Sequence, residues 1–216
     1  IETQKQAGAI TDKEFCMLLA SLLYSFDKSA NTVGHYEAYI KGKEIRGDFT
    51  FFLIEPIDLQ GKDIAIYRED ANELAKRVEA DIAFVDPPYN SRQYSRFYHV
   101  METITKWDKP PLVGTAMKPP EENMSEYCRN AAPKAFRDLV EHLNVKYIVV
   151  TYNNTYHSKS TSSQNKITLE EIREILETRG RTLIFEKAHP CFNAGKTEFS
   201  DHKEFLFITE VGERDA

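Results

Sequence analysis

The predicted fold is built around residues 83–90, which read Ala83-Phe84-Val85-Asp86-Pro87-Pro88-Tyr89-Asn90. Residues 82–85 are apolar without interruption, which predicts a short central strand of a parallel sheet, covered on both faces. Proline has no N–H to donate and a fixed φ, so residues 86–89 are expected to form a stiff loop at the carboxyl end of that strand. Open α/β sheets bind their ligands at this edge. The sequence therefore predicts a carboxylate, a rigid carbonyl and an aromatic ring at a ligand-binding edge.

This loop carries groups suited to an amino group on a planar ring. The exocyclic amine of a nucleobase is a poor nucleophile because its lone pair is delocalised into the ring. The Asp86 carboxylate and the Pro87 carbonyl can accept both of its N–H groups, which favours a pyramidal nitrogen and stabilises the positive charge that develops on methylation. The ring of Tyr89 can stack on the base. The alternative is an ordinary loop, since short motifs also occur by chance.

Residues 86–89 resemble the catalytic box of amino-methylating DNA methyltransferases. The longer runs at 86–94 and 97–104, and later 150–154 and 202–208, resemble the adenine-specific class related to Dam (the DPPY class), as found in restriction–modification systems. The resemblance implies an α/β fold, the class I S-adenosylmethionine-dependent methyltransferase (Rossmann-like) mixed sheet with a terminal antiparallel hairpin. It also implies S-adenosylmethionine as co-substrate, and DNA presenting a flipped adenine as substrate.

The resemblance also assigns roles to individual residues. The catalytic residues are Asp86, Pro87, Pro88 and Tyr89. The residues expected to contact the methyl donor are Asp70 and Asp86, and Asp70 has the alternative role of N-cap of the helix that follows it. The residues expected to contact the substrate are Asn31, Tyr36, Tyr89, Asn90, Arg92, Tyr94, Tyr152 and Phe192. For Asn31 and Tyr36 the alternative is a plain surface loop, and for Tyr94 and Phe192 it is hydrophobic packing.

One feature of the family is missing. Its donor site begins with a glycine-rich box of the form Phe-x-Gly-Gly, and no such box occurs in the sequence. The sequence is therefore expected to be the carboxyl-terminal part of an enzyme, with a fold incomplete at the N-terminus. Three explanations stay open: a second polypeptide supplies the missing part, the chain is truncated, or a deletion has left a DNA-binding or subunit-contact module. A cognate restriction endonuclease is a further expected partner, and RNA or another amine or amide is the alternative substrate.

Composition narrows the class of protein. The 216 residues have a net charge of −6, which argues against a polyelectrolyte binder but leaves room for a local DNA footprint. No apolar run is long enough for a membrane helix, and no signal peptide pattern occurs at Ile1, so a cytoplasmic protein without a membrane partner is expected. Three dispersed cysteines predict neither disulfides nor a zinc site, and the six histidines form no close pair suited to a metal, so no metal is expected.

The remaining pattern predicts repeated strands and helices. Capping signals at Thr11–Glu14, 123–126 and Thr168–Glu171 precede helices, the last of which is expected to end at Gly180, and a further helix is expected over 95–107. Strands are expected at 49–54, 64–67, 147–150, 182–187 and 204–209. We expect residues 1–60 to form a helix and loop region that contributes to target recognition, and residues 61–216 to form the catalytic domain.

Overall fold

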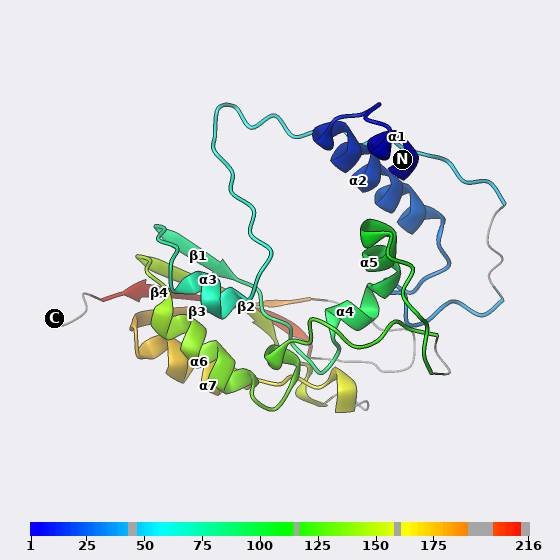
Figure 1. The fold of residues 1–216 in the computed structure, drawn as a ribbon. Coiled ribbons are helices and arrows are strands. Elements are labelled where there is room, and N and C mark those ends of the chain that lie inside the picture. The colour runs from blue at the N-terminus through cyan, green and yellow to red at the C-terminus, as the bar shows by residue number, and fades with distance from the viewer. Residues whose placement is uncertain (43–46, 115–116, 158–160, 190–200, 213–216) are drawn as a thin grey trace. The chain divides into compact units, whose positions relative to one another are not determined.

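The structure is a computed structural model that describes residues 1–42, 47–114, 117–157, 161–189 and 201–212. The chain forms two compact units. One contains residues 1–64 and 94–123 and is mainly helical, and the other contains residues 65–93 and 124–216 and holds the sheet (Figure 1). The stretch from 65 to 93 therefore belongs with the later part of the sequence.

The sheet has four strands in the order β1-β2-β4-β3. Strands β1 (Ile82–Val85) and β2 (Tyr147–Asn153) are parallel, and β4 (Lys203–Val211) runs antiparallel to both β2 and β3 (Gly180–Ala188). This confirms a mixed α/β sheet that ends in an antiparallel hairpin. The strand expected over 147–150 continues to Asn153, so Thr151 and Tyr152 belong to β2 itself.

Helices cover one face of this sheet. Figure 1 shows α6 (Ala132–His142) and α7 (Leu169–Glu177) side by side, and α3 (Ala71–Ala75) packs on α6. Alternate residues of β2 enter the core, together with buried residues of both long helices and of β4. The fully buried side chains include Phe136, Val140, Ile148, Val150, Tyr152, Ile172, Leu176 and Phe207.

Local signals fix the ends of these helices. The capping box of Thr168 and Glu171 is present at α7, which ends at Glu177, three residues before Gly180. Before α6 the side chain that caps is Ser125, not Asn123, and it starts a short 3-10 helix, η1 (Glu126–Cys128). Pro133 then lies in the first turn of α6, where its missing N–H costs no hydrogen bond.

The opposite face of the sheet is apolar and exposed. Ile82 and Phe84 of β1 are 59% and 66% exposed, and Leu183 and Phe185 of β3 are 46% and 52% exposed. Among the described residues no strand pairs with the free edge of β1. The prediction of a central strand covered on both faces is therefore wrong for β1, which is an edge strand with one face open.

The first unit contains α1 (Glu2–Gln6), α2 (Asp12–Ser29), α4 (Tyr94–Phe97) and α5 (His99–Lys106). The capping box of Thr11 and Glu14 begins α2 as predicted. The helix expected over 95–107 is two helices, because Tyr98 between them has φ −112° and ψ 21°. In the part of the chain that the structure covers, no helix has the length and apolarity to cross a bilayer.

The strands expected at 49–54 and 64–67 are absent. The N–H groups of Phe52 and Ile54 instead donate to the hydroxyls of Ser25 and Ser21, at 2.7 and 3.1 Å, so α2 takes the place of a neighbouring strand. Both serines are buried. Ile64 and Ile66 are 61% and 90% exposed. Their apolar composition suits a strand, but composition does not ensure that a neighbouring strand is there to pair with.

Candidate active site at the carboxyl end of the parallel strands

Asp86 follows β1 directly, at the edge where β2 also ends. Its Oδ1 accepts hydrogen bonds from the Tyr89 hydroxyl at 2.8 Å and from the Thr151 hydroxyl at 2.9 Å. Asp86 is exposed, whereas Pro87 is buried and Pro88 and Tyr89 are half-buried. The Asp86 carboxylate is therefore exposed to solvent and is held by the hydroxyls of Tyr89 and Thr151.

The ring of Tyr89 packs edge-on against Tyr152, with 4.9 Å between ring centroids and 72° between planes. Burial, followed by the hydrogen bond to Asp86, raises the pKa of Tyr89, so its phenol is protonated at neutral pH and serves as a donor. Tyr89 thus orients the Asp86 carboxylate through its hydroxyl.

Tyr152 supports the loop from the core side of the sheet. Its side chain is fully buried, because it alternates with Ile148 and Val150 toward the helices. Its hydroxyl donates to the Tyr89 carbonyl at 3.0 Å and accepts from the Ile167 N–H at 3.2 Å. The Lys166 N–H also donates to the Tyr89 carbonyl, at 2.8 Å, so two donors hold the loop at this one carbonyl.

The residues after Tyr89 are held by backbone and amide contacts. Asn90 accepts from the Arg92 N–H at 3.0 Å and forms an isolated bridge with Asn165. The side-chain amide of Gln93 donates to the Ser125 carbonyl at 3.0 Å and accepts from its N–H at 2.8 Å. This positions residues 90–93 against the stretch that begins η1.

Three residues at this edge were not among the predicted site residues. Thr151 binds Asp86, Asn165 donates to Asn153 at 2.8 and 3.0 Å, and Asn153 also accepts from the Thr155 hydroxyl at 3.0 Å. Thr151 could have been found from the strand pairing, because it directly follows Val150, the partner of Val85. Asn165 lies in a polar stretch that carried no sequence signal.

The other predicted site residues are placed elsewhere. Asp70 accepts from the N–H groups of Asn72 and Glu73 at 2.9 and 3.3 Å, which confirms its alternative role as an N-cap. In the helical unit, Asn31 exchanges hydrogen bonds with the backbone of Ile40. Phe192 lies outside the described residues.

Two predicted aromatic contacts also belong to the helical unit. The Tyr36 hydroxyl donates to Asp27 at 2.8 Å, and its ring stacks on Phe26 with centroids 5.9 Å apart. Tyr94 starts α4 and is 59% exposed. Burial, followed by the bond to Asp27, raises the pKa of Tyr36. Tyr36 is therefore fixed within its own unit.

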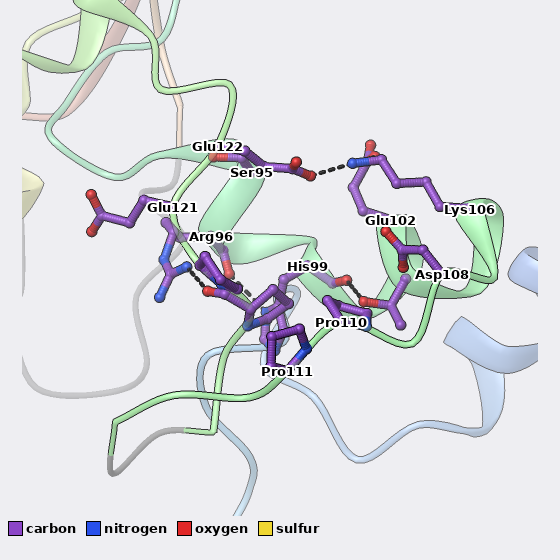
Figure 2. A pocket seen from close by; sticks show the side chains of 13 residues that line it. Ser95, Arg96, His99, Glu102, Lys106, Asp108, Pro110, Pro111, Glu121 and Glu122 are labelled. Atoms are coloured by element: carbon purple, nitrogen blue, oxygen red, sulfur yellow. Dashed lines mark hydrogen bonds and ion pairs between the residues drawn. The ribbon is translucent and has the colours of Figure 1, made fainter.

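The helical unit also contains a pocket. Figure 2 shows Lys106 directed across it toward Glu122, with which it forms an ion pair, and Arg96 donates to the Pro119 carbonyl at 2.6 Å. Its cations are thus paired within the unit, and the pocket contains none of the residues predicted to be catalytic.

The sequence predicted no close histidine pair suited to a metal, but the structure brings two histidines and a carboxylate close together. His189, His202 and Glu204 come together where β3 ends and β4 begins. The two histidines are 13 residues apart in the sequence, and only the hairpin register makes them neighbours.

Comparison with known proteins shows the family of the chain. The profile of the D12 class N6 adenine-specific DNA methyltransferases matches residues 1–175. The type II methyltransferase M.FokI of Planomicrobium okeanokoites is 36% identical over 95% of the chain, and M.NlaIII of Neisseria lactamica is 31% identical over 97%. The modification methylase LlaI of Lactococcus lactis subsp. lactis is 36% identical over 71%. No solved structure matches the chain.

The chain has a mixed α/β sheet, and the matched family implies a class I, Rossmann-like fold. The chain belongs to the D12 class of N6 adenine-specific DNA methyltransferases, a restriction–modification family that uses S-adenosylmethionine. The chain spans 62% of M.NlaIII, 32% of M.FokI and 26% of LlaI, which is less than two thirds of each relative.

Proposed function

We propose that this chain is the catalytic portion of a restriction–modification methyltransferase that moves a methyl group from S-adenosylmethionine to the exocyclic amine of a flipped adenine in DNA. One observation carries the proposal. Asp86 is exposed at the carboxyl end of β1, and Thr151 and Tyr89 orient its carboxylate. It stands in a motif that resembles the catalytic box of amino-methylating DNA methyltransferases, within the residues that the family profile matches.

In this proposal, different residues of the loop contact different parts of the adenine. Both hydrogen bonds from the described residues end on Oδ1 of Asp86, so Oδ2 accepts one N–H of the amine, and the Pro87 carbonyl accepts the other. These acceptors favour a pyramidal nitrogen and stabilise its developing positive charge. The face of Tyr89 stacks on the base, whose extrusion from the duplex costs a few kcal/mol.

S-adenosylmethionine carries the transferred methyl group on a sulfonium, and its site does not fit the residues of this chain alone. No two glycines are adjacent in the sequence, so the family's glycine-rich box is missing. Asp70, the proposed contact to the donor's adenine, already caps α3. We propose that polypeptide outside residues 1–216 builds most of the donor site, and Asp70 and Asp86 complete it.

The open face of the sheet supports this division. Strand β1 runs parallel to β2 and lies at the edge of the described sheet, so its other side can pair with a further parallel strand. Ile82, Phe84, Leu183 and Phe185 form an apolar surface on the side away from α6 and α7. Large exposed apolar patches mark interaction surfaces. We assign this surface to the donor-binding part of the methyltransferase, whether it lies on the same or on a second polypeptide.

The remaining predicted contacts are proposed for the DNA. Asn90 and Arg92 follow the catalytic loop, and Tyr152 positions it from below. We propose that residues 1–60, with Asn31 and Tyr36, contribute to target recognition, and that Tyr94 and Phe192 contact the bases. The type II methyltransferases among the relatives support a cognate restriction endonuclease as partner.

A second candidate function rests on the missing glycine-rich box. In that case the chain is a DNA-binding or subunit-contact module that has lost methyl transfer. Donor binding separates the two: a module does not bind S-adenosylmethionine even with the donor-binding part present, whereas the methyltransferase does.

Identification of the methylated nucleoside tests which substrate the enzyme uses. The chain is combined with its donor-binding part, incubated with S-adenosylmethionine and either DNA or RNA, and the digested nucleosides are analysed by mass spectrometry. The proposal predicts N6-methyladenine in DNA only. Methylation of RNA adenine, of cytosine or of a protein amide would contradict the assignment of substrate while keeping the chemistry.

Asp86→Asn tests the residue that carries the proposal. Methyl transfer should fall by at least about 100-fold, because the charged acceptor for the amine is lost. Asp81→Asn is the matched control at the opposite end of β1, where Asp81 forms an ion pair with Lys146. An Asp86→Asn enzyme as active as the control would overturn the assignment.

A further inference from the structure

The end of the β3–β4 hairpin where the chain passes from one strand to the other brings two imidazoles and a carboxylate onto one face of the sheet. Ala188 pairs with Lys203, so His189 and His202 are the next cross-strand pair, and the His189 N–H donates to the His202 carbonyl at 3.1 Å. Glu204 lies two residues further along β4 and therefore projects from the same face as His202. One ligand atom from each of the three side chains lies within 4.8 Å of the others.

The hydrogen bonds of His202 prepare it to bind a cation. Its Nδ1 lies 2.7 Å from the His189 carbonyl oxygen, which can only accept, so Nδ1 carries the proton and Nε2 keeps a lone pair when the ring is neutral. A backbone carbonyl in this position is the usual partner that fixes the tautomer of a metal-binding histidine. His202 is also buried, which limits the positions open to its ring.

The distances fit a shared ion better than a direct bond. The Nε2 of His202 and the Oε1 of Glu204 are 3.8 Å apart, which is too far for a hydrogen bond. Two ligands each about 2.0–2.1 Å from one tetrahedral zinc ion lie roughly 3.4 Å from each other. A side-chain movement of a few tenths of an ångström therefore brings both atoms onto one ion.

We propose that His189, His202 and Glu204 bind a divalent transition-metal ion, with zinc as the best match. Two imidazoles and one carboxylate are a ligand set that suits zinc, whereas magnesium and calcium prefer oxygen ligands. Three protein ligands leave a position for water. Because β4 begins beside the end of β2, where Asn153 pairs with Glu204, this site lies on the same edge of the sheet as Asp86.

This inference does not depend on the proposed methyl transfer. A bound ion ties the last residue pair of β3 and β4 together at the edge that carries the catalytic loop. Glu204 is the cross-strand partner of Asn153 at the end of β2, beside that loop. We therefore assign the ion a positioning role in the hairpin, with no part in the methylation chemistry.

Zinc titration of the chelator-treated chain tests the proposal. Competition with a chromogenic zinc chelator should show one high-affinity site, and Co²⁺ in place of zinc should give the visible absorption bands of a four-coordinate site. His189→Gln and Glu204→Gln should each weaken zinc binding by at least about tenfold. His142→Gln is the control, because His142 also lies near a carboxylate, that of Asp138 at 3.5 Å, but outside this cluster.

Thermal unfolding with and without zinc distinguishes variants that have lost the metal site from variants that misfold. Zinc should raise the melting temperature of the native chain and of His142→Gln by similar amounts, and that of Glu204→Gln by clearly less at the same zinc concentration. Absence of a high-affinity site, or equal weakening by His142→Gln, would overturn the proposal.

Discussion

The hydroxyl of Thr151 on β2 donates to the Oδ1 of Asp86, 2.9 Å away across the end of the neighbouring parallel strand β1. The carboxylate that we propose to be catalytic is thus oriented by Thr151 of the sheet as well as by Tyr89 of its own loop. Two donors on one oxygen leave the other oxygen for a substrate amine. The pairing of the two parallel strands is therefore part of the candidate active site.

Thr151→Val should lower the rate of methyl transfer while preserving the fold. Valine has nearly the shape of threonine, and the loss of one exposed hydrogen bond should change the free energy of unfolding by only about 1 kcal/mol. A fall in kcat of about tenfold is expected if one of the two orienting donors is lost. Thr182→Val, which removes a hydroxyl bonded to Thr209 in the same sheet, is the control. A variant with unchanged kcat would mean that Tyr89 alone orients the carboxylate.

Tyr152→Phe should destabilise the chain. The variant leaves the N–H of Ile167 without its acceptor and removes one of the two donors to the Tyr89 carbonyl. An unsatisfied buried donor costs about 1–3 kcal/mol, which urea unfolding can measure. Tyr147→Phe, on an exposed ring at the start of the same strand, should have little effect. Equal stability of the two variants would contradict the supporting role of Tyr152.

Two substitutions at Asp70 separate its two roles. Asp70→Ala removes the N-cap of α3 and should cost about 1 kcal/mol of stability, whereas Asp70→Asn keeps the cap. If Asp70 also contacts the methyl donor, Asp70→Asn should weaken S-adenosylmethionine binding in the complete enzyme without a matching loss of stability. Unchanged donor affinity in Asp70→Asn would leave the capping role alone.

Phe84→Glu tests the open face of the sheet. Phe84 is 66% exposed on β1, so a charge there should be tolerated by the chain alone but should block docking of the donor-binding part. Co-purification and restored methyl transfer are the two measurements. Phe51→Glu, at an exposed phenylalanine of the helical unit, is the control. Docking of Phe84→Glu as tight as that of the control would show that the donor-binding part contacts another surface.

The sequence predicted what local chemistry controls. Prolines placed the catalytic loop after β1, and capping boxes placed the starts of α2 and α7. The sequence-based prediction failed where residues distant along the chain determine the secondary structure. Residues 49–54 have the composition of a strand, but the hydroxyls of Ser21 and Ser25 take their backbone N–H groups.

The candidate site shows the same division. Asp86 and Tyr89 were evident from a motif, whereas Thr151 joins them only through the register of two strands 65 residues apart along the chain. His189 and His202 meet only through the hairpin register. Sequence spacing carries no information about either contact.

Transfer of labelled methyl groups from S-adenosylmethionine to DNA, by this chain alone and with the donor-binding part added, tests the central claim most directly. We predict label on adenine only in the combined sample, since the loop of Asp86 holds the amine and the added part holds the donor. Label with the chain alone would contradict our account of the donor site. No label in either sample would contradict the assignment as a methyltransferase and favour a binding module.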